Sequence, residues 1–333
     1  MPSTESHITA VAGANIALVK YWGKRSTEKN LPATGSVSLT LDSLQTHTSI
    51  RKTNSDEDVF LLNGAEASDA QRKKASRFLN LIAKTSERDK VIIESRNNFP
   101  TGAGLASSAS GFAALALAGS EFFGSSLSKK ELSILARQGS GSAARSIFGG
   151  FVEMSLGKTD HGDEDFAILL QNEGFWDVRM LIAITSEKEK DLGSTEGMQR
   201  TAETAPYFPS WIESSVSDIQ NIKNAIAAKD IEKVGSIMEH STFKMHGLAM
   251  AANPPILYWN PITVEAIQRI WQLRKTGIPA YITIDAGPQV KILTLPEYQD
   301  KITDALGNID GVKQLISAKP GKGAHLIKEE VYG

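Results

Sequence analysis

A glycine-rich turn, set between an apolar run and a long Ala/Leu/Ser segment, most strongly constrains how this chain can fold. The turn spans residues 97–110, Asn-Asn-Phe-Pro-Thr-Gly-Ala-Gly-Leu-Ala-Ser-Ser-Ala-Ser, and follows the strand-like residues 91–93. Glycine lets the backbone approach a ligand closely, and the first turn of a helix has N–H groups without a partner inside the helix. With the helix dipole, those donors form an anion site. We therefore expect a strand, a phosphate-binding turn and a helix over 106–123.

Other glycine-rich phosphate motifs do not fit the chain. The Gly-Lys-Thr at 157–159 has Val152 where a Walker A loop needs a glycine. A Gly-x-Gly-x-x-Ala pattern at 139–144 resembles a dinucleotide fingerprint, but a helix is expected before it instead of the required strand. By position alone, a loop that enters a core helix with capping serines is an equal alternative for the turn at 97–110.

Composition narrows the functional class. The chain has 333 residues, 41% of them hydrophobic and 22% charged, with a net charge of −2, which suits a globular protein of about two domains. A nucleic-acid binder normally has a basic excess, and no apolar run reaches the roughly 18 residues of a membrane span. The chain has no cysteine, so disulfides and thiolate sites are excluded. Because the N-terminus shows no export signal, we expect a cytoplasmic protein without nucleic-acid or membrane partners.

Cationic and aromatic side chains gather at residues 20–25, between predicted strands at 7–13 and 37–50. The cluster contains Lys20, Tyr21 and Lys24. Lysines bind phosphates as movable point charges, so the cluster predicts a site for an anionic substrate. A solvated basic loop is the alternative here, and the basic run at 72–74 is interpreted as a solvated helix face.

Two further segments carry candidate ligands. A Gly/Ser turn at 139–142 precedes Arg145, whose guanidinium can pair with a carboxylate or phosphate through two parallel bonds. A flexible connection with an exposed arginine is the alternative. Asp285 follows a predicted strand at 278–284 and precedes a Gly-Pro turn, a position that suits a catalytic carboxylate and an Asx-turn equally.

The C-terminal half alternates helices and apolar strands. Residues 210–228, 230–250 and 262–275 have helical periodicity, and the continuous apolar run at 180–185 predicts a buried strand. The dense polar stretch at 187–191 suggests a division there, so we expect domains at 1–188 and 189–333.

Five blocks of sequence, in order, carry a family resemblance along nearly the whole chain. They are Asn-Ile-Ala-Leu-Val-Lys-Tyr-Trp-Gly-Lys-Arg at 15–25, the turn at 97–108, Ala-Arg-Gln-Gly-Ser-Gly-Ser-Ala-Ala-Arg-Ser at 136–146, Gly-Ser-Thr-Glu-Gly-Met at 193–198 and Asp-Ala-Gly-Pro at 285–288. The chain resembles the diphosphomevalonate (mevalonate 5-diphosphate) decarboxylases, within the superfamily of galactokinase, homoserine kinase, mevalonate kinase and phosphomevalonate kinase. Gln289 stands where that family often has Asn.

The resemblance implies an α+β fold of two domains with the active site in the cleft between them. The N-terminal domain would resemble ribosomal S5 domain 2 and bind ATP, and the C-terminal domain would be ferredoxin-like. The implied reaction is the ATP-dependent decarboxylation of mevalonate 5-diphosphate to isopentenyl diphosphate in the mevalonate pathway of isoprenoid biosynthesis. It proceeds by phosphorylation of the 3-hydroxyl and then loss of phosphate and CO2. ATP would be the co-substrate and Mg²⁺ the metal, and the family's habit suggests a homodimer.

The resemblance also assigns roles to individual residues. Catalysis is assigned to Asp285, Lys20 and Arg145. Residues assigned to the substrate are Tyr21, Lys24, Ser140, Ser142, Arg145 and Ser194. Residues assigned to ATP are Asn97, Pro100, Gly102, Ala103, Gly104, Leu105, Ala106, Ser107 and Ser108. Ser107 or Ser108 is assigned to Mg²⁺.

Three other functions stay open at this point. Two are enzymatic: a mevalonate 3-kinase that stops at the phosphorylated alcohol, and a decarboxylase that takes mevalonate 5-phosphate. The third is a non-catalytic nucleotide-binding or RNA-binding protein with an S5-like fold, which the net charge of −2 does not favour.

Overall fold

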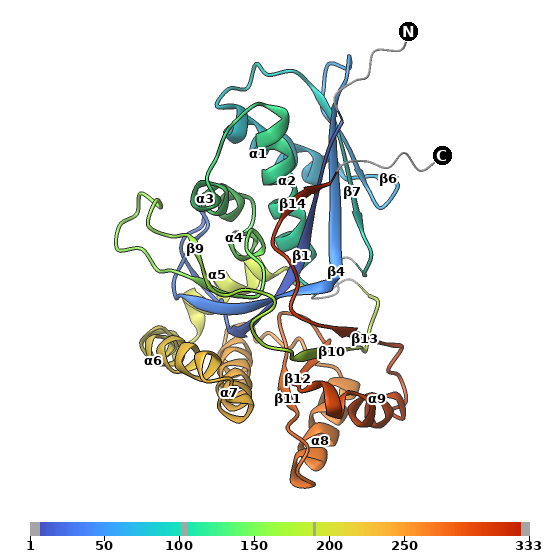
Figure 1. The fold of residues 1–333 in the computed structure, drawn as a ribbon. Coiled ribbons are helices and arrows are strands. Elements are labelled where there is room, and N and C mark those ends of the chain that lie inside the picture. Colours follow the sequence, from blue (N-terminus) through green and yellow to red (C-terminus); the bar gives the residue numbers. More distant parts are fainter. Residues whose placement is uncertain (1–6, 101–104, 189–190, 328–333) are drawn as a thin grey trace.

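Two β-sheets organise the chain, and helices pack around them (Figure 1). The structure is a computed structural model that describes residues 7–100, 105–188 and 191–327. In these residues the larger sheet has the strand order β14-β1-β4-β7-β5-β6, with β8 beside β4 and β9 beside β8. Its strands are β1 (Ile8–Val19), β4 (Ser36–Lys52), β5 (Val59–Leu62), β6 (Ala65–Glu66), β7 (Val91–Asn97), β8 (Phe151–Met154), β9 (Ala167–Gln171) and β14 (His325–Ile327).

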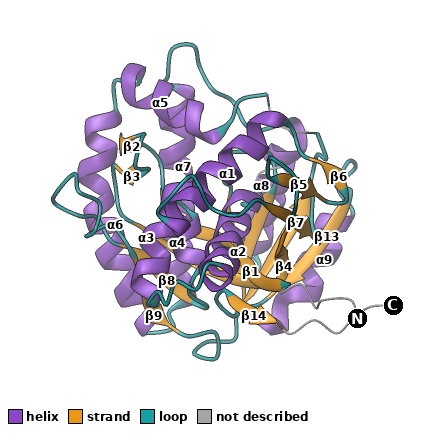
Figure 2. Cartoon of the chain, turned by 90° about the horizontal axis from the view of Figure 1, so that it is seen from above, coloured by secondary structure: helices purple, strands orange, loops and turns teal. Residues whose placement is uncertain are grey.

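Four helices cover one face of the larger sheet, and Figure 2 shows α2 running along β1 and β4. They are α1 (Asp69–Ala83), α2 (Ser107–Phe122), α3 (Lys129–Gly139) and α4 (Ala143–Ser146). Helix α3 begins with a capping box: the Ser128 hydroxyl accepts from the Glu131 N–H at 3.3 Å, and the Glu131 carboxylate accepts from the Ser128 N–H at 2.8 Å. A short hairpin of β2 (Lys24–Ser26) and β3 (Leu31–Pro32) stands apart from both sheets.

The smaller sheet is antiparallel with the order β11-β12-β10-β13. Its strands are β10 (Arg179–Ile184), β11 (Tyr281–Thr283), β12 (Val290–Thr294) and β13 (Gln314–Ala318). The first and third strands in chain order are central, as in a ferredoxin-like sheet. The remaining helices are α5 (Ser194–Thr204), α6 (Phe208–Ala227), α7 (Ile231–Met250), α8 (Pro261–Lys275), η1 (Pro296–Tyr298) and α9 (Gln299–Gly307). The predicted α+β fold is confirmed.

Strand β10 shows why a continuous apolar run forms a strand here. Met180 and Ile182 face a core shared with β4, α6 and α7, whereas Leu181 and Ala183 face a second core against α8 and α9. Successive side chains of a strand point to opposite faces, so a strand buried on both faces has no polar position. The shared core joins the two sheets into one body.

Strand pairing crosses the predicted division at residue 188. β10 lies N-terminal to that point but pairs in the smaller sheet, and β14 lies C-terminal to it but pairs with β1 in the larger sheet. The domain limits themselves stay a prediction. Among the described residues, no helix combines the length and apolarity needed to cross a membrane.

Strand β1 is longer than its alternating pattern predicts, because it continues through residues 14–19 after a bulge. The register against β4 shifts between Gly13 and Asn15. A Cβ on Gly13 would lie 2.4 Å from the Leu41 carbonyl oxygen, so the backbones approach too closely for another residue. The bulge places Asn15 at the edge of the candidate site described next.

Candidate active site

A cleft is lined by residues from both halves of the chain. The lining residues come from β1, the segment after it, the starts of α2 and α5, the α4 region, α7 and the turn after β11: Asn15, Ala17, Lys20, Tyr21, Trp22, Ala106, Ser107, Ser108, Ser142, Arg145, Ser194, Met198, Met245, Asp285 and Ala286. The start of α2 and Asp285, which are far apart in sequence, therefore face the same cleft. This is the arrangement on which the sequence interpretation depends.

Two buried lysines hold the carboxylate of Asp285. Lys20 Nζ lies 2.7 Å from Oδ1 and Lys291 Nζ lies 3.1 Å from Oδ2. Each lysine side chain is 1% exposed, whereas that of Asp285 is 23% exposed. The acid is thus the member of the cluster that a ligand in the cleft can reach.

The cluster carries more positive than negative charge, which shifts the ionisation of its members. Burial alone would raise the pKa of Asp285, but the charges and hydrogen bonds of Lys20 and Lys291 hold it well below its usual range. Burial lowers the pKa of Lys20 to about 8, although the neighbouring carboxylate opposes this shift. Asp285 is therefore ionised at neutral pH, and Lys20, with its pKa of about 8, loses its proton just above neutral pH.

The residues that flank Asp285 in the sequence form contacts that fix the backbone on both sides of it. The Gln289 amide accepts from the Thr185 N–H at 2.6 Å and donates to the Ser186 carbonyl at 2.5 Å, which ties the turn after Asp285 to the end of β10. The His246 ring lies with Nε2 3.2 Å from the Ile284 carbonyl. Burial, and then the charge of Lys20, lower the pKa of His246 to about 3, so the ring is neutral and Nε2 donates to that carbonyl.

Arg145 is buried among neutral groups and does not lie on an exposed turn. Its Nη1 donates to Ser36 Oγ at 2.5 Å, and its Nε donates to Ser38 Oγ at 2.9 Å and Asn15 Oδ1 at 3.2 Å. Burial lowers the pKa of Arg145 to about 10, and no carboxylate of the described residues forms an ion pair with it. A buried cation with neutral partners at the edge of a cleft favours an anionic ligand.

Hydroxyl groups surround this cation. Ser142 lines the cleft, and Ser140 lies behind it, with its Oγ 3.4 Å from Ser142 Oγ and 3.3 Å from Ser108 Oγ. Tyr21 Oη is buried and has no hydrogen-bond partner within the described residues. Burial also raises the pKa of Tyr21, so this hydroxyl stays protonated. A buried, unpartnered phenol in a cleft is a candidate donor to a ligand.

The start of α2 has an unusual backbone. Ala106 occupies the N-cap position with φ 58°, a left-handed conformation that a non-glycine residue rarely adopts, and its side chain cannot cap the helix. Such outliers cluster at functional sites. Ala106, Ser107 and Ser108 line the cleft. Leu105 is in the core, Pro100 is half-buried, and Gly102, Ala103 and Gly104 lie outside the described residues.

A second, more apolar hollow adjoins the start of α2. Lining residues from α1, α2 and the neighbouring strands are Thr46, Phe60, Leu62, Gln71, Lys74, Ala75, Ser95, Asn97, Ser107, Ser108, Gly111, Phe112 and Leu115. Asn97 belongs to this hollow, where its Oδ1 accepts from Thr46 Oγ1 at 2.6 Å. Lys74 keeps its Nζ 4.6 Å from the centre of the Phe112 ring, so this lysine borders the hollow and is more than part of a solvated face.

Lys24 lies beside the cleft, in a neighbouring recess that also includes Thr195. Its Nζ donates to Asn30 Oδ1 at 2.6 Å and to Thr195 Oγ1 at 3.3 Å. Burial, and then the charge of Lys74, lower the pKa of Lys24 to about 8. Because Thr195 follows Ser194 at the start of α5, the ammonium group stands one residue from the cleft lining.

Sequence reasoning missed Lys291. The residue stands in the otherwise apolar strand β12, and lysine is rarely fully buried unless it is paired. A lysine in an apolar strand was therefore the available signal for a buried acidic partner.

No group of three or more His, Cys, Asp or Glu residues that could hold a metal occurs in the described part of the chain. Mg²⁺ is commonly held by one or two protein ligands together with substrate phosphates, and Ser107 and Ser108 suit that arrangement.

Comparison with known proteins gives a consistent result. Residues 12–167 match the diphosphomevalonate decarboxylase-like N-terminal domain, and residues 180–327 match the mevalonate 5-diphosphate decarboxylase C-terminal domain. A diphosphomevalonate decarboxylase of Ganoderma lucidum is 38% identical over 323 residues, which cover 90% of this chain and 80% of the relative.

Two solved structures extend the match to the fold. MDDEF in complex with MVAPP, AMPPCP and magnesium is 40% identical, with a TM-score of 0.90 and coverage of 97% of this chain and 99% of that chain. The mevalonate diphosphate decarboxylase from Enterococcus faecalis, in a structure on mevalonate diphosphate mediated ATP binding, is 40% identical, with a TM-score of 0.88 and the same coverage. By sequence over both halves and by fold, the chain belongs to the diphosphomevalonate decarboxylase family.

Proposed function

We propose that the chain catalyses the ATP-dependent decarboxylation of mevalonate 5-diphosphate to isopentenyl diphosphate, with release of ADP, phosphate and CO2. One observation carries the proposal: Asp285, held by Lys20 and Lys291, opens onto the cleft that also contains the start of α2 and the buried Arg145. These are the groups needed to activate an alcohol, hold a triphosphate and bind a carboxylate. The family relationship supports the same activity.

Asp285 orients the 3-hydroxyl of the substrate and accepts its proton as the new O–P bond forms. A tertiary alcohol is a poor leaving group, so phosphorylation must come first. Phosphoryl transfer depends mainly on alignment and charge neutralisation, and the nucleophile needs little early deprotonation. A carboxylate with a strongly lowered pKa suits this task, because it is always ionised and accepts the proton late.

The start of α2 holds the phosphates of ATP, and the apolar hollow beside it takes the adenine base against Phe112 and Leu115. The N–H groups of a helix start donate to the phosphate oxygens without rearrangement. When bound, Mg²⁺ neutralises charge on the phosphates, and Ser107 or Ser108 would hold it together with those phosphates.

Arg145, with Ser142 in the cleft and Ser140 behind it, holds the substrate carboxylate. Its role is to position that group, because binding the carboxylate more tightly than the transition state would oppose its departure as CO2. After phosphate leaves C3, the bond between C2 and the carboxylate carbon breaks. Its electrons form the new double bond between C2 and C3, and the carboxylate departs as CO2. Tyr21, Lys24 and Ser194 hold the 5-diphosphate at the other end of the substrate.

A substrate comparison tests the proposal. The purified protein is given ATP with mevalonate, its 5-phosphate or its 5-diphosphate, and ADP and CO2 are measured separately. We expect equal amounts of ADP and CO2 when the 5-diphosphate is the substrate, and neither product with mevalonate or its 5-phosphate. ADP without CO2 would identify a 3-kinase, preference for the monophosphate would identify a phosphomevalonate decarboxylase, and neither product would indicate a non-catalytic protein. A cytoplasmic location and a homodimer remain predictions from the sequence.

A further inference from the structure

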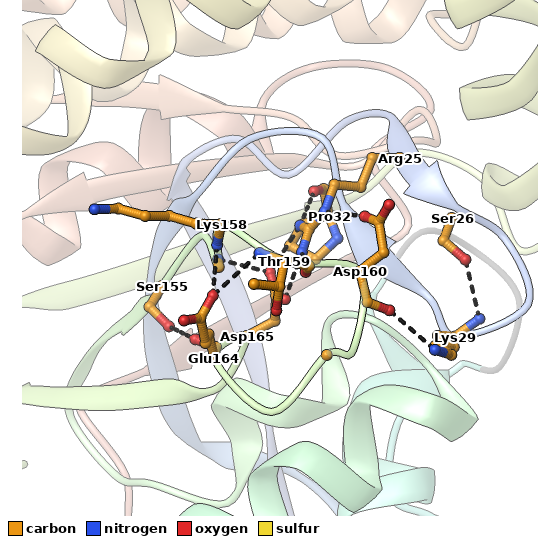
Figure 3. Close-up of polar contacts among 12 residues, drawn as sticks. Arg25, Ser26, Lys29, Pro32, Ser155, Lys158, Thr159, Asp160, Glu164 and Asp165 are labelled. Carbon is orange, nitrogen blue, oxygen red and sulfur yellow. Dashed lines mark hydrogen bonds and ion pairs between the residues drawn. The ribbon is translucent and has the colours of Figure 1, made fainter.

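A bidentate ion pair fastens the β2–β3 hairpin to the loop that follows β8 (Figure 3). Arg25 Nη1 donates to Asp165 Oδ1 at 2.8 Å, and Nη2 donates to Asp165 Oδ2 at 2.6 Å. The Asp165 side chain is fully buried, and that of Arg25 is 23% exposed. Paired bonds of this geometry are strong and directional, unlike the exposed ion pairs elsewhere on the surface.

The loop is shaped around this carboxylate. The Gly157 N–H donates to Asp165 Oδ1 at 2.9 Å, and a Cβ on Gly157 would lie 2.6 Å from Asp165 Oδ2. Buried Arg137, from α3, donates to the backbone carbonyls of Gly162 and Asp165. The loop itself therefore holds the acid, its carboxylate through the Gly157 N–H and its backbone through Arg137.

Arg25 also ties together backbone segments. Its Nη1 donates to the Pro32 carbonyl at 2.9 Å, on the second strand of its own hairpin, and its Nη2 donates to the Thr159 carbonyl at 2.8 Å. Both ends of the hairpin and the loop are thus held by one guanidinium. The contact of Nε with Asp160 Oδ1 is longer, 3.3 Å, and involves a side chain that is 87% exposed.

Lys24 precedes Arg25 on this short strand, and neighbouring side chains of a strand point to opposite faces. Arg25 points to the loop, whereas Lys24 reaches Asn30 and Thr195 at the start of α5. No carboxylate of the described residues forms an ion pair with Lys24. The position of its ammonium group therefore depends on neutral contacts and on where the hairpin is held.

We propose that the Arg25–Asp165 pair is a positioning device for the substrate: it holds the β2–β3 hairpin so that Lys24 faces the site of the 5-diphosphate at the start of α5. This inference rests on the proposed function. Asp165 lines neither the cleft nor the recess of Lys24, and Arg25, which borders that recess, directs its guanidinium to Asp165. The pair therefore acts through Lys24 on substrate affinity and leaves the phosphoryl-transfer groups in place.

Asp165→Asn tests the proposal, because it keeps the size of the side chain and removes the charge. We expect the KM for mevalonate 5-diphosphate to rise about five- to tenfold, within the range of coupling between contacting residues. The KM for ATP and kcat should stay within about twofold of the wild type. Asp163→Asn is the matched control, since it removes an exposed acid of the same loop that lines neither the cleft nor the recess beside it, and its kinetics should be unchanged.

A double-mutant cycle with Lys24→Ala separates positioning from general destabilisation. If the pair acts through Lys24, adding Asp165→Asn to Lys24→Ala raises KM by less than twofold further, whereas independent effects would multiply. Arg25→Lys, which keeps the charge but loses the paired bonds, provides a second variant should Asp165→Asn fold poorly. An unchanged KM in folded Asp165→Asn or Arg25→Lys, or multiplying effects in the cycle, would overturn the inference. Failure of the wild type to turn over the 5-diphosphate would instead overturn the proposed function.

Discussion

Lys291 Nζ lies 3.1 Å from Asp285 Oδ2, on the side of the carboxylate opposite Lys20. The lysine extends from β12 and the acid from the turn that follows β11, so a hairpin of the smaller sheet brings them together. With both oxygens occupied by ammonium groups, the carboxylate has one fixed orientation. The Asp285 side chain, 23% exposed, forms part of the cleft lining.

Replacing Lys291 with Met should move the acid limb of the pH–rate profile to higher pH. Two lysines keep the pKa of Asp285 below its usual range, and the reactive form is the carboxylate. Removing one lysine raises that pKa, so protonation and loss of activity begin at a higher pH on acidification. The profile of kcat/KM from about pH 4 to 8, which reports the ionisations of the free enzyme, tests this. Ionisation of Asp285 should give no acid limb in this window in the wild type, and an acid limb should enter it in Lys291→Met, because burial then raises the pKa against one lysine instead of two.

The surface substitution Lys313→Met, next to the same sheet, serves as the control for Lys291→Met. Its profile should coincide with that of the wild type. If Lys291→Met is folded by circular dichroism and its profile also coincides with that of the wild type, Lys291 has no part in the ionisation of Asp285.

Asp285→Asn should reduce turnover by at least about a hundredfold, the lower range for loss of acid–base help. The affinity for ATP should change by only a few fold, since we propose that the nucleotide binds at the start of α2. The variant leaves two buried lysines without their acid, so its unfolding temperature should also fall. Activity is therefore compared below that temperature, with Asp300→Asn, an exposed acid on α9, as the control. Near-normal turnover would remove Asp285 from the mechanism.

Lys24 should make substrate affinity depend on pH in the alkaline range. Its pKa is lowered to about 8, so above that pH the ammonium loses its charge and the KM for the diphosphate rises. Lys24→Arg keeps a charge at higher pH and should give a flat KM up to about pH 9.5. Lys24→Ala should raise KM at every pH, with a smaller change in kcat. A dominant loss of kcat in Lys24→Ala would place Lys24 in the chemical step.

Local signals in the sequence predicted many elements and much of the site. The serine and glutamate of the capping box at Ser128 and the Asn-Gly pair at 63–64 are local signals of this kind, because contacts over a few residues determine where such elements begin and end. The turn before α2 and the acid after β11 were also recognisable, since each combines a strand exit with a distinctive set of residues. The structure then brings Ala106 and Asp285 to one cleft.

Long-range pairing could not be predicted in this way. The run at 180–184 is equally apolar whichever sheet it joins, so its membership of the smaller sheet depends on partners more than a hundred residues away. β14 is a three-residue strand whose place beside β1 has no local signal. Lys291 was missed for a different reason: Asp285 lies only six residues away in sequence, but the two side chains meet because β12 pairs with β11, and that pairing has no signal at Lys291 itself. The burial of Arg145 also depends on β4, which carries the serines that it contacts.

Arg145 and Arg137 offer a matched pair for separating function from stability, because each is 2% exposed. Arg137 donates to the backbone carbonyls of Gly162 and Asp165 through two buried hydrogen bonds, and a buried acceptor that loses its donor costs stability. Arg137→Gln should therefore lower the unfolding temperature clearly. Arg145 donates to serine hydroxyls and an asparagine that can reorient or bond elsewhere.

Arg145→Gln should leave the unfolding temperature of the ligand-free protein within about 4 °C of the wild type, the shift expected for roughly 1 kcal/mol or less in a chain of this size. Burial without an acidic partner lowers the pKa of Arg145 to about 10, so at pH 7 its charge costs stability, and removing that charge offsets the hydrogen bonds that are lost. The KM for the substrate should rise at least about tenfold, the effect of losing roughly 1.4 kcal/mol of carboxylate binding. At the same concentration, substrate should raise the unfolding temperature of this variant less than that of the wild type. If Arg145→Gln without ligand loses as much stability as Arg137→Gln, then Arg145 stabilises the fold and its role is not to bind the substrate carboxylate.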